Sequence, residues 1–274
     1  MRQSRPIGTP IDDARLQRWI EDFGGYRRNV TRARIAAWLG QFSEKDRDLA
    51  ARLLDSVEFL SHAAVEEGLY GALNSLPGWN NNREARTGKW RFVAFSRSAG
   101  ESGDKMLHSL RSAAQLGSAA NDDLFVGKRD LLMEELTADD TVVFVDDFAG
   151  TGRQVATGWR EVMEELLPGR PHIYLVLVAA YIDATNRIAA ETPIELYTMT
   201  TLPEGDNVFS DACESFSADD KKRLLTYCRR ASTSNPRGFG KCGLLLVLAH
   251  KTPNNSIPVL HATRNERWSG LFPR

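Results

Sequence analysis

Apolar residues recur at helical spacing in the first third of the chain. The side chains Leu16, Trp19, Ile20 and Phe23, for example, would share one face of a helix. The glycine pair that follows them is typical of a helix end. On this basis helices are expected over four stretches, about 10–23, 31–39, 43–60 and 62–73. The range 1–85 is therefore predicted to be a helical N-terminal region.

The pattern changes after residue 85, where short apolar runs alternate with amphipathic stretches. Strands are predicted over 90–95, 141–145, 172–182 and 194–199, and helices near 103–116, 153–167 and 184–190. Runs that are apolar on both faces and separated by helices indicate a parallel sheet covered on two sides. The sequence thus predicts an α/β fold with its parallel-sheet core in 86–200.

The remaining range, 201–274, is predicted to be a C-terminal cap. It contains a polar helix over about 217–231 and a buried run over 243–250. We expect that run to contribute a further core strand.

Composition excludes several classes of protein. The chain has 274 residues, 42% of them hydrophobic, and a formal net charge of -1, which argues against coating of nucleic acid or membrane by bulk charge. No apolar run reaches the roughly 20 residues that span a bilayer, and the first residues have no apolar core of a leader peptide. The three scattered cysteines, without a CxxC pair, suit a reducing compartment. A cytoplasmic location is expected, with no membrane partner.

Positive charge is concentrated at the start of the chain. Residues 1–36 contain eight basic and four acidic residues, a local balance of +4. This charge is either a solvated helical face or a docking surface for an acidic partner or RNA.

The segment TVVFVDDFAGTGRQV, residues 141–155, carries the most specific chemistry. A buried strand is expected to end in two consecutive acids, Asp146 and Asp147, and a short glycine-rich loop over 148–152 then leads into a helix. Backbone N–H groups of such a loop, with the helix N-terminus and the Thr151 hydroxyl, form an anion nest suited to a phosphate monoester. The two acids can accept hydrogen bonds from a vicinal diol. Together they fit a ribose 5-phosphate.

Three other interpretations of this segment were compared. A Walker B strand would need a GxxxxGK[ST] loop, which the chain lacks. A dinucleotide-binding fingerprint would need glycine where Val155 stands, and its acids should follow the loop. The third interpretation is an ordinary strand–helix turn with Asp147 as an incidental cap.

The same residues resemble the signature of type I phosphoribosyltransferases, which is a strand, two acids, a short loop ending in Thr-Gly, and a helix. Asp146, Asp147, Thr151 and Gly152 match it directly, whereas Gln154 stands where the family usually has Ser or Thr. The resemblance implies that the two acids hold ribose and meet Mg²⁺ indirectly, through the bound substrate. It also implies that phosphoribosyl pyrophosphate is held by the loop residues Phe148, Ala149, Gly150, Thr151, Gly152, Arg153 and Gln154.

A second loop follows the strand 90–95, where such an enzyme would contact pyrophosphate. Small residues at a helix start make Ser102 and Gly103 candidates for anion binding, although Ser102 is equally well explained as an N-cap. Arg97 and Lys105 are candidates for neutralising the leaving group. The polar stretch 117–130 is interpreted either as a mobile lid or as an ordinary loop.

The wider chain resembles the phosphoribosyltransferase-like proteins of prokaryotic conflict systems, the PRTase-CE family. The resemblance rests on WLGQFSEKDRDLAARLLDSVEFLS, SAGESGDKML, VVFVDDFAGTGRQ, HKTPNNSIPVLH and WSGLFPR, in that order. It implies a phosphoribosyltransferase-like core and an effector of antiviral defence, with a defence protein or ribonucleoprotein as a partner of the basic N-terminal helices. A catalyst, a nucleotide sensor without turnover and a glycosidase-type effector that degrades nucleotides all remain open.

Overall fold

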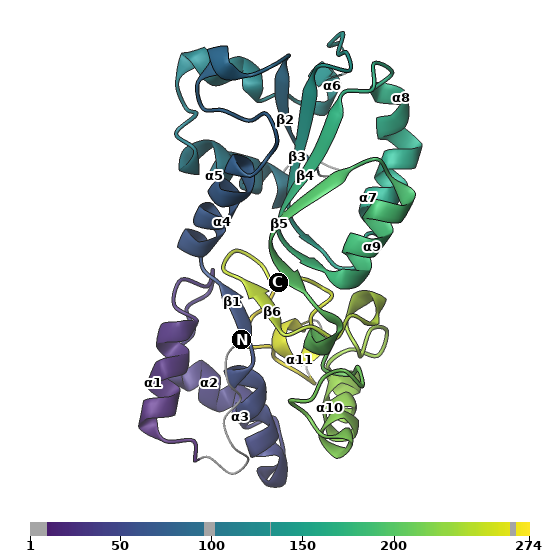
Figure 1. The fold of residues 1–274 in the computed structure, drawn as a ribbon. Coiled ribbons are helices and arrows are strands. Elements are labelled where there is room, and N and C mark those ends of the chain that lie inside the picture. Colours follow the sequence, from purple (N-terminus) through teal and green to yellow (C-terminus); the bar gives the residue numbers. More distant parts are fainter. Residues whose placement is uncertain (1–9, 96–101, 132, 264–266) are drawn as a thin grey trace. The chain divides into compact units, whose positions relative to one another are not determined.

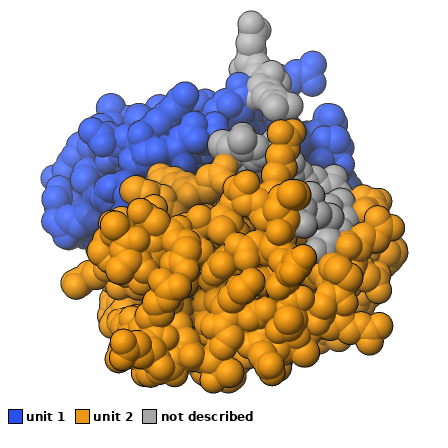
Figure 2. Space-filling view, turned by 90° about the horizontal axis from the view of Figure 1, so that it is seen from above, with its two compact units in different colours: residues 1–62, 203–274 blue, residues 63–202 orange. Residues whose placement is uncertain are grey.

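The computed structural model describes residues 10–95, 102–131, 133–263 and 267–274. The chain forms two compact units, which Figure 2 distinguishes by colour. Unit 1 comprises residues 1–62 and 203–274, and unit 2 comprises residues 63–202. The division of the sequence into a helical region (1–85), an α/β core (86–200) and a C-terminal cap (201–274) remains a prediction.

A four-stranded parallel sheet in the order β2–β3–β4–β5 forms the centre of unit 2. Its strands are β2 Trp90–Ala94, β3 Thr141–Ala149, β4 His172–Tyr181 and β5 Glu195–Leu202. Helices α7 to α9 lie on one side of this sheet, and α4 and α5 lie on the other (Figure 1). Because both faces are covered, almost every residue of β2, β3 and β4 is buried. The α/β class with a parallel-sheet core is confirmed.

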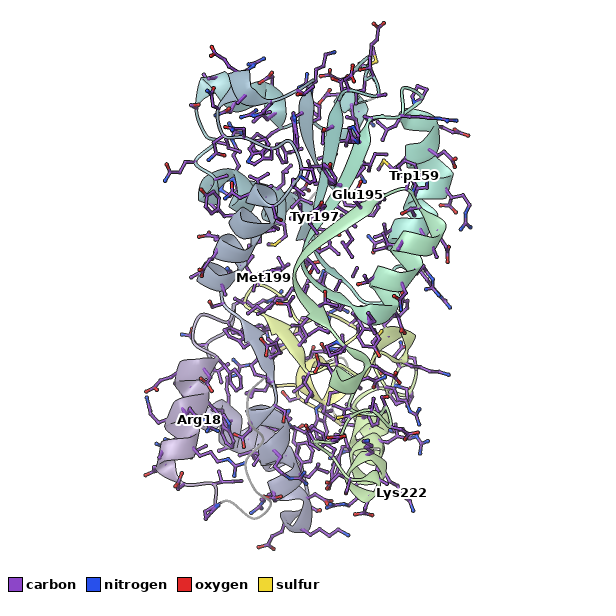
Figure 3. All side chains as sticks on the ribbon, viewed as in Figure 1. Arg18, Trp159, Glu195, Tyr197, Met199 and Lys222 are labelled. Carbon is purple, nitrogen blue, oxygen red and sulfur yellow. The ribbon has the colours of Figure 1, made fainter. Side chains whose placement is uncertain are left out.

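Helix α4 precedes the first of these strands, and the other helices of unit 2 lie between successive strands in the sequence. The helices are α4 His62–Asn74, α5 Ser102–Ala113, α6 Lys128–Leu131, α7 Arg153–Gly158, α8 Glu164–Leu166 and α9 Ile182–Glu191. A π-helical turn, Trp159–Met163, joins α7 to α8. Figure 3 shows Trp159 on one side of the sheet and Met199 of β5 on the side of α4. Gly68 of α4 has no side chain there, and a Cβ would lie 1.9 Å from the Met199 sulfur. The glycine therefore permits close packing of α4 on β5.

Unit 1 combines helices with a two-stranded parallel sheet, in which β1 (Glu58–Leu60) pairs with β6 (Leu246–Leu248). Its helices are α1 Asp13–Asp22, α2 Arg32–Leu39, α3 Arg47–Asp55, α10 Ala218–Ala231 and α11 Pro258–His261. Helix α10 begins with a capping box, because Ser217 and Asp220 each bind the other's backbone N–H. In the part of the chain that the structure describes, no helix is long and apolar enough to cross a membrane.

Two segments of unit 1 depart from the sequence-based expectation. The helix expected over 43–60 is wrong in its last turn, because α3 ends at Asp55 and residues 58–60 form β1. Pairing with β6 makes these residues a strand, and this partner lies far away in the sequence. The buried run 243–250 does contain a strand, but β6 pairs with β1 and not with the four-stranded sheet.

Internal ion pairs use much of the positive charge near the N-terminus. The guanidinium of Arg15 is buried and lies 2.5 Å from the Asp55 carboxylate, which also accepts hydrogen bonds from Arg18 and from the Trp19 indole. Arg32 pairs with Asp13 at 2.5 Å. Asp55 lies outside residues 1–36, so its pairing with Arg15 and Arg18 offsets one positive charge of the +4 balance, whereas Asp13 is already counted in that balance.

Candidate functional site

The turn between β3 and α7 consists of Gly150, Thr151 and Gly152. Gly152 has a φ of +67°, and a Cβ at this position would lie 2.9 Å from the carbonyl oxygen of Ala184 in α9. Both the backbone conformation and the close approach favour glycine. The predicted glycine-rich turn is thus present, and it lies directly against the first residues of α9.

The turn is shorter than expected because β3 is longer. The strand was predicted over 141–145 with the two acids at its end and a loop from Phe148. It continues to Ala149, since Phe148 and Ala149 still pair with the small residues Ala179 and Ala180 of β4. Both acids of the predicted site therefore lie within the strand. The part of the segment outside the sheet ladder is 150–152.

Asp146 and Asp147 are both buried, with 9% and 6% of their surface exposed. The Asp146 carboxylate accepts the backbone N–H of Asp147 at 2.8 Å and the Ser102 hydroxyl at 3.0 Å. Burial, followed by the like charge of Asp147, raises the pKa of Asp146 to about 8. Asp146 therefore favours its protonated form at neutral pH.

Helix α5 begins beside this pair. A Cβ on Gly103 would lie 3.2 Å from the Phe95 backbone nitrogen and 3.2 Å from the Val145 carbonyl oxygen, so the first turn of α5 packs directly on the ends of β2 and β3. The positive end of this 12-residue helix thus lies next to two carboxyl groups. Ser102, the first residue of α5, uses its hydroxyl to bind Asp146. The two predicted binding segments are brought together.

The other predicted residues are placed less centrally. Arg97 lies outside the described residues. Lys105 is exposed on the first turn of α5, and no hydrogen bond or ion pair among the described residues joins it to the acids. Arg153 and Gln154 are exposed at the start of α7, and the Arg153 N–H donates to the Thr151 hydroxyl at 3.5 Å.

Arg187 is a site residue that the sequence did not indicate. Its Nη1 donates to the Thr151 carbonyl oxygen at 2.5 Å, and its Nε lies 3.2 Å from a Glu191 oxygen. Its Cβ is one of the atoms that a side chain at position 152 would meet. The residue lies 36 positions after Thr151, on the helix that follows the next strand, so no local pattern connects the two.

The described donors at this site are carboxyl groups, hydroxyl groups and backbone N–H groups. Among the described residues, no cluster of three or more His, Cys, Asp or Glu side chains that can hold a metal ion is present. Two adjacent carboxyl groups are, however, enough to approach Mg²⁺ when phosphate oxygens complete its shell. The arrangement therefore fits a magnesium ion carried by a phosphorylated ligand.

Comparison with known proteins agrees with this geometry. None of the curated proteins compared with the chain matches it. A family model, PRTase-CE, matches residues 35–274, which include the acid pair, the glycine turn, all of unit 2 and unit 1 from residue 35 onward. The parallel sheet and the strand–turn–helix segment at 141–158 are the features expected of a phosphoribosyltransferase-like core. The chain belongs to the PRTase-CE family.

Proposed function

We propose that this protein binds phosphoribosyl pyrophosphate, or a related ribose 5-phosphate nucleotide, at the acid pair and the turn 150–152. The observation that carries the proposal is the meeting of three elements at the carboxyl ends of β2 and β3. These are the buried acids Asp146 and Asp147, the first turn of α5 with Ser102, and the glycine turn at Gly152. Ligands of open α/β sheets bind at this end of the strands.

Each element has a chemical role in the proposed complex. The acid pair accepts hydrogen bonds from the ribose diol, and Asp146, whose pKa is raised to about 8, can also donate from its protonated carboxyl. The 5-phosphate is held by the N–H groups of the turn and by the Thr151 hydroxyl, next to the N-terminus of α7. Mg²⁺ bound to the pyrophosphate supplies charge neutralisation when it is present.

In the catalytic form of the proposal, the ribose 5-phosphate unit is transferred to a nucleophile. The bond between the anomeric carbon and pyrophosphate breaks, the electron pair leaves with pyrophosphate, and the nucleophile forms the new bond. Positive charge develops on the sugar near the acid pair. Arg97 and Lys105 are the proposed partners of the leaving group. Positioning by the turn and the acids supplies much of the rate enhancement.

A nucleotide sensor without turnover is the second candidate. It is favoured by Gln154, which is exposed at a position where the resembled enzymes usually carry a hydroxyl. It is also favoured by Lys105, which is exposed and forms no hydrogen bond or ion pair with the described site residues. A glycosidase-type effector, with water as the nucleophile, uses the same binding residues. The three forms differ in their products.

Calorimetric titration with phosphoribosyl pyrophosphate and Mg²⁺ tests the shared binding step. Binding should be lost in the double variant Asp146→Asn with Asp147→Asn and kept in Asp139→Asn, a change at an exposed aspartate of the preceding turn. Pyrophosphate release in the presence of acceptors identifies a transferase, and binding without release identifies a sensor. Loss of nucleotides without pyrophosphate formation identifies the glycosidase. If the double variant binds as well as the wild type, the site is elsewhere.

We further propose a cytoplasmic role in antiviral defence, with a defence protein or ribonucleoprotein bound to the basic N-terminal helices. Arg27 and Arg28 are exposed in the connection between α1 and α2. Their side chains have no hydrogen-bond or ion-pair partner among the described residues. Protection from phage in cells should depend on the acid pair. Co-purification of the partner should be reduced by Arg27→Glu, and an unchanged yield would contradict the docking proposal.

A further inference from the structure

Unit 1 contains an open cavity of about 550 Å³ between α2 and the C-terminal segment. Its described wall is largely apolar, with two arginines and a few polar side chains. The described lining residues are Arg28, Arg34, Ala37, Trp38, Gln41, Thr263, Ser269, Gly270, Leu271 and Pro273. A cavity of this volume is large enough for a small organic ligand. It belongs to a different compact unit from the acid pair.

Hydrogen bonds from side chains to the backbone join the segments that line the cavity. Arg34 donates from Nη2 to the Leu271 carbonyl oxygen at 2.5 Å, and from Nη1 to the carbonyl oxygens of Arg28 and Asn29 at 2.9 and 2.5 Å. The Gln41 amide donates to the Ser269 carbonyl at 2.9 Å and accepts the Ser269 N–H at 2.7 Å. Both ends of the wall are thus tied together before any ligand arrives, which lowers the ordering cost of binding.

The described lining residues of the cavity carry positive charge only. None of these described residues is acidic, and neither Arg28 nor Arg34 forms an ion pair within the described part of the chain. Burial, with the neighbouring charge of Arg28, lowers the pKa of Arg34. The three bonds of Arg34 occupy three of the five N–H groups of its guanidinium, which leaves two for a ligand. An anion would relieve the repulsion between the two arginines and accept these donors.

We infer that this cavity binds a small organic anion of nucleotide size, with its phosphate on Arg28 and Arg34 and its planar base on the apolar wall. A bound nucleic-acid strand would need a longer groove with a series of cations and exposed aromatic platforms. Here Trp38 is 1% exposed, and two arginines stand at a single concave site. The inference is independent of the function proposed for the acid pair.

Calorimetric titration of the full chain with AMP, adenosine, inorganic phosphate and a short single-stranded oligoribonucleotide tests the inference. AMP should bind more tightly than adenosine and phosphate. Arg28→Ala should weaken AMP binding by about tenfold or more, because a charge-assisted bond is lost. Arg27→Ala is the matched control, since it removes the same charge from an adjacent exposed position that does not line the cavity. It should change AMP affinity by less than about twofold.

Other outcomes would overturn the inference. Equal weakening by Arg27→Ala and Arg28→Ala would indicate diffuse electrostatic attraction, and binding of the oligoribonucleotide alone would indicate a nucleic-acid surface. AMP binding that is lost in the Asp146→Asn, Asp147→Asn variant but kept in Arg28→Ala would place AMP at the acid pair. The absence of any AMP binding at millimolar concentration would exclude the site. If phosphoribosyl pyrophosphate does not bind at the acid pair but AMP binding still depends on Arg28, the function proposed for the acid pair is wrong and the inference about this cavity stands.

Discussion

Replacing Asp146 with asparagine should make the protein less sensitive to alkaline pH. In the wild type, burial and the charge of Asp147 raise the pKa of Asp146 from 3.8 to about 8. Between these two values the folded state holds a proton that the unfolded state has lost, so stability falls as pH rises from about 4 to about 8. Asparagine imitates the protonated acid, since its oxygen can still accept from Ser102 and from the Asp147 N–H.

The size of the effect follows from the shift. One pKa unit corresponds to about 1.4 kcal/mol, so a shift from 3.8 to about 8 corresponds to at most about 6 kcal/mol of unfolding free energy at pH 8 and above. The stability difference between variant and wild type should therefore grow steadily across this window. It should level off above pH 8.

Urea unfolding of both proteins at pH 5 to 9 measures this difference. Asp140→Asn is the control, because the pKa of Asp140 is shifted in the opposite direction. Asp140 is also buried, which alone would raise its pKa, but hydrogen bonds from the Lys89 and Thr137 backbones outweigh burial and lower it. Removing that carboxylate should cost stability at all pH values above 4. If Asp146→Asn proved less stable than the wild type at pH 8, Asp146 would be an ionised, stabilising group and the argument would fail.

Two further predictions concern the glycine turn. Gly152→Ala should lower the unfolding free energy by roughly 1–3 kcal/mol, because φ is positive there and the new Cβ would meet the Ala184 carbonyl oxygen. The control Gly71→Ala lies in a helix with open space around it and should be neutral or stabilising; thermal unfolding of the two variants compares them. Arg187→Ala should weaken ribose 5-phosphate binding by about tenfold without unfolding the protein, because Thr151 loses its anchor. Calorimetry with the folded variant checks this, and unchanged affinity would show that the turn needs no support from α9.

Local patterns were sufficient to place most helices and the four strands of the larger sheet along the sequence. Helix α10 illustrates the reason, because Ser217 and Asp220 form its capping box three residues apart, and its apolar face repeats at helical spacing. The same applies to the buried strands of the sheet, whose continuous apolar runs are typical of strands covered on both faces. In these segments the interactions that define the structure lie within a few residues of each other.

Long-range pairing decided the segments that the patterns misjudged. Residues 58–60 continue the apolar spacing of α3, yet they become β1 because Leu246–Leu248 lies beside them as a parallel partner. In the same way β3 extends to Ala149 because β4 continues to Tyr181. A ladder hydrogen bond depends on a strand that is distant in the sequence, and spacing along one segment does not record it.

The residue types of the candidate site can be seen along the chain, whereas their assembly cannot. Two adjacent acids before a Thr-Gly turn are the residue types on which the proposed binding of a diol and a phosphate rests. The bond from Ser102 to Asp146 spans 44 positions, and the bond from Arg187 to Thr151 spans 36. The raised pKa of Asp146 arises from burial among these elements, and burial exists only once the sheet and its helices have packed.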